Sequence, residues 1–184
     1  MIAILGESAS GKTLLQSNLV NAGLGFHKLV YYTTRPIRDG EADGVDYHFV
    51  SENVFNELSE LGFFLEQNIY NDWYYGAAKA DCLHSDYTVA VLTPAGFRRL
   101  VKAGVDIKSI YLKVDRRSRL IQVLDRGDNI EEAYRRNLSD VGQFDGIGEE
   151  VDYVIDNTHY HMSAEQTLLC LKTILEEVGY EFKQ

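Results

Sequence analysis

The sequence predicts an α/β protein with a mostly parallel sheet, and two observations support this prediction. The 184 residues, of which 45% are hydrophobic and 25% are charged, suit one globular domain with a single core. Short apolar runs also alternate with helical patterns, which is typical of βα units on a parallel sheet. These runs lie at residues 1–5, 28–32, 88–92, 109–114 and 153–155.

The first apolar run leads directly into a motif for phosphate binding. Residues 6–13 read GESASGKT, the pattern G-x-x-x-x-G-K-[ST]. In this pattern backbone N–H groups surround phosphate oxygens, the lysine reaches the β- and γ-phosphates, and the Ser/Thr hydroxyl binds Mg²⁺. A helical pattern follows as far as Gly23, so bound phosphates would lie at a helix N-terminus, where the helix dipole favours anions. The residues expected to bind nucleotide phosphates are Gly6, Glu7, Ser8, Ala9, Ser10, Gly11, Lys12 and Thr13, with Lys12 catalytic and Thr13 on Mg²⁺.

The segment of residues 33–80 interrupts the alternation of strands and helices. It holds nine of the 21 aromatic residues, several turns rich in Gly, Asp and Asn, and one clear helical pattern at residues 52–61. This composition predicts a strand-rich insertion.

Capping residues mark the helices that follow this insertion. Thr93, Asp115 and Ser163 each precede a helical pattern and can accept a hydrogen bond from its first turn. Pro94 suits a first helical position, and Gln166 lies three residues after Ser163, as in a capping box.

The charge of the chain is unevenly distributed. Its formal net charge is −10, which argues against general binding to nucleic acid or to anionic membranes. Eleven of the 18 Lys and Arg residues nevertheless lie between Arg98 and Arg136; a solvated helix face accounts for about half of the arginines in this run. Within it, residues 125–144 are polar, punctuated by glycine and rich in arginine, as expected of a mobile cover.

The sequence shows no sign of export. Cys82 and Cys170 are the only cysteines and have no close spacing, which predicts packing roles in a reduced, cytoplasmic protein. No apolar stretch approaches ~18 residues, and no signal-peptide pattern opens the chain. The histidines of residues 159–161 are expected in a loop, because side chains two residues apart diverge and no third ligand is evident.

A second anion site follows the run at 28–32. Residues 33–41 read TTRPIRDGE and residues 44–50 read GVDYHFV. Arg35 and Arg38, with the hydroxyl of Tyr47, form a compact set of donors for a phosphate monoester, because guanidinium groups match phosphate oxygens bidentately.

The motif TTRxxRxGExxGxDYxFV resembles the guanylate kinase family over its whole length. Further matches are the FLE of residues 64–66, the WYYG of 73–76, Arg126-Gly127, and the VDYVI of 151–155 with Asn157. Together they cover nearly the entire chain. The resemblance implies a three-layer nucleoside monophosphate (NMP) kinase core at residues 1–32, 81–124 and 145–184, an NMP-binding insertion at 33–80 and a small helical lid at 125–144.

The resemblance also implies an activity and its participants. It implies transfer of phosphate from ATP to GMP or dGMP with Mg²⁺, in a monomer or homodimer with no nucleic-acid or membrane partner. Arg35, Arg38, Tyr47 and Tyr75 would hold the acceptor phosphate, with Arg35 also catalytic, and Glu66 would accept hydrogen bonds from guanine. Glu41 would orient an arginine or a metal-bound water. Arg126 and either Arg135 or Arg136, with Arg136 preferred, would reach the transferred phosphate, and Asn157 would meet the adenine of ATP.

The sequence departs from the family pattern near the base. Tyr31 and Tyr32 stand where the family has a serine, Ala77 replaces a Ser or Thr, and residues 91–93 read VLT in place of D-x-D. Three alternatives follow: a kinase for a different (d)NMP, a guanylate-kinase-like protein-interaction module, and a P-loop ATPase or GTPase without a small-molecule acceptor. The intact motif at 6–13 opposes the module, and the Arg35, Arg38 and Tyr47 cluster opposes the last.

Overall fold

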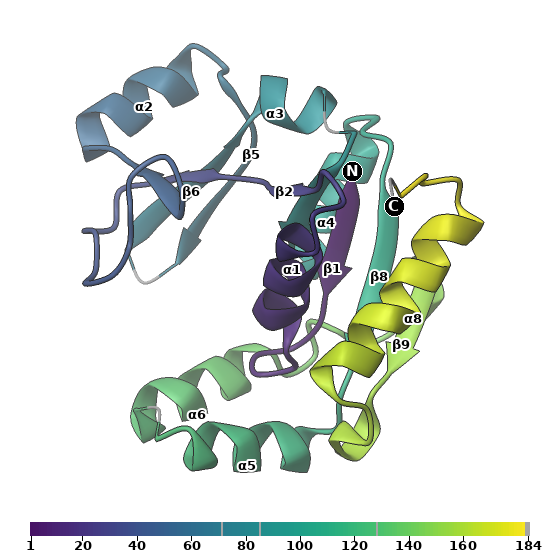
Figure 1. Ribbon diagram of the computed structural model, residues 1–184. Helices are drawn as coiled ribbons and strands as arrows, with labels where there is room; N and C mark the ends of the chain where they lie inside the picture. Colours follow the sequence, from purple (N-terminus) through teal and green to yellow (C-terminus); the bar gives the residue numbers. More distant parts are fainter. Residues whose placement is uncertain (71, 85, 128, 183–184) are drawn as a thin grey trace.

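The computed structural model describes residues 1–70, 72–84, 86–127 and 129–182, and its core is a five-stranded parallel sheet (Figure 1). The strand order is β2-β7-β1-β8-β9, with every neighbouring pair parallel. The parallel sheet predicted from the alternating apolar runs is therefore confirmed. The strands are β1 (Ile2–Leu5), β2 (His27–Lys28), β7 (Thr88–Val91), β8 (Lys108–Lys113) and β9 (Tyr153–Asp156).

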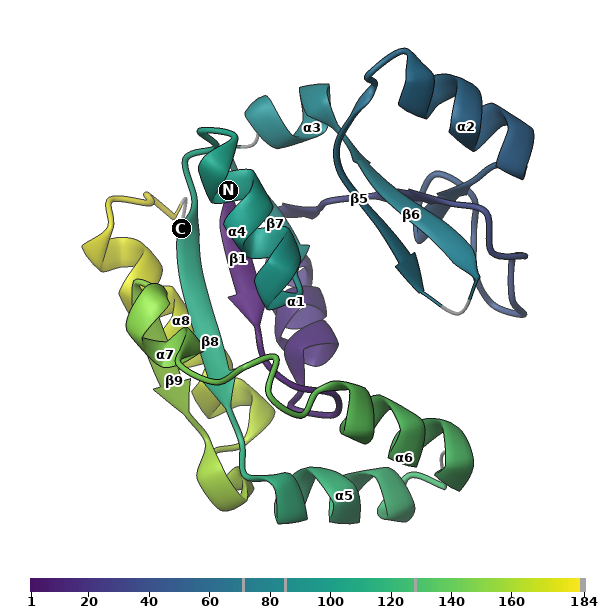
Figure 2. The same ribbon diagram turned by 180° about the vertical axis from the view of Figure 1, so that it is seen from behind.

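Helices cover both faces of this sheet and give the predicted three layers. Alternate residues of β1 point to opposite faces, so Ile2 and Ile4 pack in one core cluster while Ala3 and Leu5 pack in the other. The first cluster lies under α1 (Lys12–Asn21) and α8 (Ala164–Glu177). The second lies under α4 (Pro94–Lys102) and α7 (Ile147–Glu150), which Figure 2 shows from behind.

The predicted helix caps are confirmed. The side chain of Thr93 accepts from the N–H of Gly96 at the start of α4, and Asp115 accepts from Ser118 at the start of α5 (Arg116–Asp125). Ser163 and Gln166 form the reciprocal hydrogen bonds of a capping box before α8.

A second sheet of four strands stands apart from the core sheet (Figure 1). Its order is β4-β3-β6-β5, and α2 (Glu52–Glu60) packs on it through Phe55, whose ring stacks 4.5 Å from that of Phe64. A short helix, α3 (Lys79–Leu83), follows β6. The strands are β3 (Tyr31–Thr33), β4 (Tyr47–Phe49), β5 (Phe64–Tyr70) and β6 (Trp73–Ala78).

The prediction of one strand over residues 28–32 is wrong. His27 and Lys28 pair with β7 in the core sheet, whereas Tyr31 pairs with Tyr47 in the second sheet. Between them Leu29 donates its N–H to Val89 O at 2.9 Å and is buried in the core. The two ends of the run belong to different sheets, so the second sheet begins at Tyr31.

The arginine-rich segment forms a helical pair. Helix α6 (Ile130–Ser139) lies beside α5, where Arg116 Nε donates to Asn137 Oδ1 at 2.7 Å. Figure 2 shows this pair and the second sheet projecting from opposite ends of the core. A 3-10 turn, η1 (Thr158–Tyr160), follows β9. Within the described residues, every helix is too short or too polar to cross a membrane.

Candidate functional site

Residues 6–13, called the P-loop below, join the carboxyl end of β1 to the start of α1. A Cβ on Gly6 would lie 2.5 Å from Ser10 Oγ and 2.8 Å from the Leu112 carbonyl oxygen, so the loop can pass here only with glycine. Gly11 is the N-cap of α1 and has a φ of 96°, in the left-handed region that favours glycine. Both glycines of the motif are therefore required by the backbone of the loop.

Lys12 lies inside the curve of the P-loop. Its Nζ donates to the carbonyl oxygen of Glu7 at 2.7 Å. Burial of the ammonium lowers the pKa of Lys12 to about 8, although the nearby carboxylates of Asp140 and Glu7 oppose the shift. The ammonium group thus faces the backbone of the loop and is mainly charged at neutral pH.

A cleft of about 480 Å³ runs along the P-loop. Lys12 and Thr13 line it together with Arg126, Arg136 and Asn157. Arg126 is the C-cap of α5 and Arg136 lies in the last turn of α6, so two helices supply the two guanidinium groups. The structure thus brings residues 8–13, Arg126, Arg136 and Asn157 to one cleft, whereas, among the described residues, Gly6 and Glu7 do not line it.

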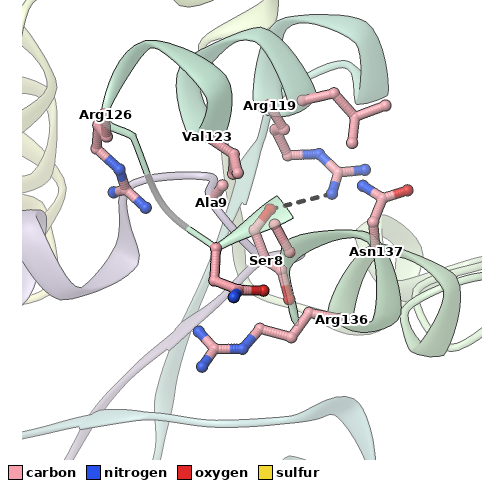
Figure 3. A pocket seen from close by; sticks show the side chains of 10 residues that line it. Ser8, Ala9, Arg119, Val123, Arg126, Arg136 and Asn137 are labelled. Atoms are coloured by element: carbon pink, nitrogen blue, oxygen red, sulfur yellow. Dashed lines mark hydrogen bonds between the residues drawn. The ribbon is translucent and has the colours of Figure 1, made fainter. Parts of the chain in front are cut away.

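A neighbouring cleft of about 370 Å³ touches the P-loop at Ser8 and Ala9, and Figure 3 shows residues that line it. Arg126 and Arg136 line this cleft as well. Among the described residues, Arg135 is absent from the lining of both clefts. Of the two candidates, Arg136 is thus the one that lines both clefts with Arg126, and the choice between them stays a prediction.

Arg119 is a residue of this site that the sequence did not single out. It is 5% exposed, and its Nη1 donates to the Ser8 carbonyl oxygen at 3.1 Å, the dashed line of Figure 3. Its Nε donates to the Val114 carbonyl oxygen at 3.1 Å. Longer ion pairs join it to Glu7 at 3.6 Å and to Asp140 at 3.9 Å. The sequence did contain a signal, because Arg119 lies four residues before the apolar Val123 and therefore shares a helix face with it.

Asp140 also contacts the P-loop directly. Its Oδ2 accepts the backbone N–H of Ser8 at 2.6 Å. The carboxylate of Glu7 accepts from the Tyr111 hydroxyl at 3.0 Å, and the hydroxyl of Tyr160 donates to the Ala9 carbonyl oxygen. The P-loop is therefore held on several sides by side chains from outside the motif.

Asn157 lies at the edge of the larger cleft but is only 5% exposed. Its Oδ1 accepts from the N–H of Met162 at 2.8 Å, and its Nδ2 donates to the Met162 carbonyl oxygen at 3.3 Å. These hydrogen bonds give Asn157 a role in shaping the loop before α8. Its contact with adenine stays a prediction.

The second anion cluster lies in and beside the second sheet. The Arg35 guanidinium is paired bidentately with Glu41, with Nη2–Oε1 at 2.7 Å and Nη1–Oε2 at 3.0 Å. Oε2 of Glu41 also accepts the backbone N–H of Arg38 at 2.9 Å. The hydrogen bonds from Arg35 lower the pKa of Glu41, so the carboxylate is ionised at neutral pH. Contact with an arginine, one of the two arrangements expected for Glu41, is present.

Aromatic rings surround this arginine. The guanidinium carbon of Arg35 lies 5.3 Å from the Tyr47 ring centroid, and the rings of Tyr47 and Tyr75 are 6.0 Å apart in an edge-on arrangement. Arg35 is 7% exposed and Arg38 is exposed. The cluster thus holds one buried, paired guanidinium and one exposed guanidinium close to Tyr47 and Tyr75.

Glu66 lies on β5 and is only 4% exposed. Burial raises the pKa of this carboxyl, and the ion pair with Arg99, whose Nη2 is 2.8 Å from Glu66 Oε1, opposes the rise. Arg99 comes from α4, and no feature of the sequence distinguishes it from the adjacent Arg98.

The departures from the family pattern have structural explanations. Ala77 is fully buried in β6, Tyr31 is half-buried in β3, and Thr93 caps α4 through its hydroxyl at 3.1 Å from Gly96 N. These positions are occupied by packing and capping groups where the family pattern has base-reading or carboxylate side chains.

Comparison with known proteins gives one consistent family. The family model described as guanylate kinase matches residues 1–178. A guanylate kinase from Helicobacter pylori is 28% identical over 183 residues, covering 97% of this chain and 89% of that relative. A guanylate kinase from Caulobacter vibrioides is 31% identical over 167 residues, covering 87% of this chain and 78% of that relative. The crystal structure of guanylate kinase from Anaplasma phagocytophilum superposes with a TM-score of 0.66 at 21% identity, over 98% of this chain and 87% of that chain.

Proposed function

This chain belongs to the guanylate kinase family, and we propose that it transfers the γ-phosphoryl group of ATP to a phosphate oxygen of GMP or dGMP, releasing ADP and GDP or dGDP. The match of the guanylate kinase family model to residues 1–178 supports this activity most strongly. The chain also retains both of the anion-binding clusters that the reaction requires. One cluster is the P-loop with its arginines, and the other is the Arg35 cluster.

The donor half of the reaction depends on the P-loop. Lys12 would contact the β- and γ-phosphates, and the charge of a bound nucleotide would raise the pKa of this lysine above its value of about 8. Arg126 and Arg136 are exposed side chains on the rim of the same cleft. They would close on the γ-phosphoryl group as negative charge redistributes in the transition state, which is electrostatic stabilisation by preorganised donors.

The acceptor half depends on the Arg35 cluster. Arg38, Tyr47 and Tyr75 would hold the phosphate of the acceptor together with Arg35. Glu41 fixes the guanidinium plane of Arg35 before the acceptor binds, so little side-chain freedom remains to be lost on binding. An acceptor phosphate oxygen is already anionic, so no general base is required. Positioning two anions in line is the main task of the protein.

Magnesium fits the chemistry of the donor site. Mg²⁺ prefers oxygen ligands and often binds through one or two protein groups plus phosphate oxygens, and the Thr13 hydroxyl lies on the cleft that holds Lys12. The bound ion would neutralise phosphate charge. Within the described part of the chain, no group of three or more His, Cys, Asp or Glu side chains could hold a metal by itself. Binding would therefore depend on the nucleotide.

Glu66 supports guanine as the base. An ionised carboxylate accepts hydrogen bonds from N1–H and the exocyclic amine of guanine, whereas adenine presents an acceptor at N1. A different (d)NMP remains the second candidate, because Ala77 and Tyr31 offer fewer polar contacts to the base than the family pattern has. The cytoplasmic location is likewise a proposal, supported by the free thiols of Cys82 and Cys170.

A coupled ADP-release assay tests the proposed function. MgATP is supplied with GMP, dGMP, AMP, CMP, UMP or dTMP in turn, and a reaction without acceptor measures ATP hydrolysis. The expected result is fastest ADP release with GMP or dGMP. Fastest turnover of a pyrimidine nucleotide would refute the guanine assignment, and equal ADP release with and without acceptor would refute the kinase activity.

A further inference from the structure

The ion pair between Arg99 and Glu66 joins the two sheets of the molecule. Glu66 belongs to β5 of the second sheet, and Arg99 belongs to α4, which packs on the core sheet. The Glu66 side chain is 4% exposed, whereas that of Arg99 is 46% exposed. A solvent-accessible cation therefore reaches a buried carboxylate across the boundary between the two parts of the chain.

The carboxylate is seated closely against α4. A Cβ on Gly96 would lie 3.4 Å from Glu66 Oε1 and 3.7 Å from its Cδ, in ordinary van der Waals contact, so the carboxyl group lies against the backbone of α4 at this position. Arg99 follows Gly96 by three residues and therefore projects from the same side of the helix. The helix thus contacts the Glu66 carboxyl group at Gly96 and provides the positive charge of Arg99.

Glu66 retains hydrogen-bonding capacity in this arrangement. Within the described part of the chain, it receives one hydrogen bond, from Arg99 Nη2 to Oε1. An ionised carboxylate has about four lone-pair sites, so Oε2 and the second lone pair of Oε1 are available. Two hydrogen bonds from a ligand can be accepted while the ion pair stays intact.

Two other titratable groups interact electrostatically with Glu66, and both are neutral at neutral pH. They are the phenol of Tyr31 on β3 and the thiol of Cys82 on α3. Burial raises the pKa of both, to about 12 for Cys82. Among these described partners of Glu66, Arg99 is therefore the one that supplies positive charge.

We propose that Arg99 is a specificity-determining residue, which keeps the Glu66 carboxylate ionised and oriented toward the guanine edge of the acceptor. The inference rests on the proposed function. It adds Arg99, which lies outside the acceptor-binding sheet, to the residues that select the base. The D-x-D carboxylates of the family pattern are missing from this chain. The inference assigns part of the selection of the base to α4 instead.

The chemical reason lies in the two protonation states of Glu66. The ionised group is an acceptor only, so it suits the two donors of guanine and repels N1 of adenine. A protonated carboxyl group has an O–H that can donate to N1 of adenine. Because burial favours the protonated form, removal of Arg99 weakens discrimination against adenine as well as binding of guanine.

The test compares Arg99→Ala and Arg99→Lys with Arg98→Ala. Arg98 is the matched control, because it lies on the same helix and pairs with the exposed carboxylate of Glu150 at 2.5 Å. Steady-state kcat and KM are measured for GMP, AMP and ATP across pH 5 to pH 8. The acceptor's own phosphate also titrates in this pH range. Because every variant is assayed with the same acceptor, this titration affects all pH profiles equally and does not contribute to the difference between a variant and the wild type.

For Arg99→Ala we expect kcat/KM for GMP to fall about three- to thirtyfold, since the pair is partly exposed and screened. The preference for GMP over AMP should narrow, and the KM for ATP should change little. The acid limb of the GMP profile should move to higher pH, because the pKa of Glu66 rises when Arg99 is lost. Arg99→Lys should recover part of the loss, and Arg98→Ala should match the wild type.

Two results would overturn the inference. One is an Arg99→Ala variant with wild-type selectivity and an unmoved acid limb. The other is an equal loss with GMP and AMP that Arg99→Lys does not recover, which would indicate a purely structural role. Failure of the wild type to phosphorylate GMP would instead refute the proposed function, before any variant is compared.

Discussion

Replacing Arg119 with methionine tests whether side chains outside the motif hold the P-loop in its working shape. Methionine keeps most of the apolar stem and removes the guanidinium. Arg119 donates to Ser8 O and Val114 O, both at 3.1 Å, and pairs with Glu7 and Asp140 at 3.6 and 3.9 Å. The substitution therefore removes the hydrogen-bond donor of two carbonyl groups and the positively charged partner of two carboxylates.

The expected loss of stability follows from these contacts. Breaking a buried ion pair costs about 3–5 kcal/mol when the remaining charge has no other partner. Here Glu7 keeps its hydrogen bond from Tyr111 and Asp140 keeps the N–H of Ser8, and the ion-pair distances are long. We therefore expect a loss of about 2–3 kcal/mol in the free energy of unfolding, which corresponds to a fall in Tm of roughly 4–12 °C for a chain of this size.

The kinetic effect should be concentrated on ATP. Because Arg119 and Asp140 hold the two backbone groups of Ser8, we expect kcat/KM for ATP to fall about tenfold or more. Urea unfolding and steady-state kinetics measure the two effects. Arg117, an exposed neighbour on the same helix, is the matched control, and Arg117→Ala should stay within about 0.5 kcal/mol of the wild type.

A double substitution tests whether Arg119 and Asp140 act together in holding the P-loop. Arg119→Met combined with Asp140→Asn should cost less than the sum of the two single changes, because the asparagine removes a carboxylate that Arg119→Met leaves unbalanced. Wild-type stability and wild-type ATP kinetics in Arg119→Met would refute the reasoning. Strict additivity of the two substitutions would exclude Asp140 from the network.

Further predictions concern the donor, the acceptor and the base. Lys12→Ala should lower kcat about a hundredfold or more without changing the Tm; wild-type turnover would contradict the role of Lys12. Because Lys12 is charged below its pKa of about 8, kcat/KM for MgATP should fall as pH rises through about 8, and a flat profile to about pH 10 would contradict this. Arg35→Ala should raise the KM for GMP by about one to three orders of magnitude with little change for ATP; equal damage to both would mean that the cluster serves another ligand. Glu66→Gln should impair GMP and dGMP selectively, which a panel of nucleotides measures, and an unchanged preference would argue against base recognition by Glu66.

Features that depend on local sequence were predictable. The P-loop, the cap at Thr93 and the capping box at Ser163 each involve residues within about one helical turn of each other, so spacing alone specifies them. The pairing of Arg35 with Glu41 also lies within one short motif.

Features that depend on tertiary packing were not predictable. Residues 28–32 have the composition of one strand, but strand propensity does not identify a pairing partner, and Lys28 and Tyr31 pair in different sheets. Arg98 and Arg99 are equivalent in the sequence, yet Arg99 alone of the two pairs with Glu66. The choice depends on how α4 is rotated against β5, which no local pattern records.

The most direct test of phosphoryl transfer follows the γ-phosphate itself. ATP radiolabelled at the γ-phosphate is mixed with the protein, Mg²⁺ and GMP, and the products are separated and counted. We predict that the label appears in GDP in the same molar amount as the ADP formed. Recovery of the label as inorganic phosphate, with GMP unchanged, would contradict the proposed kinase activity.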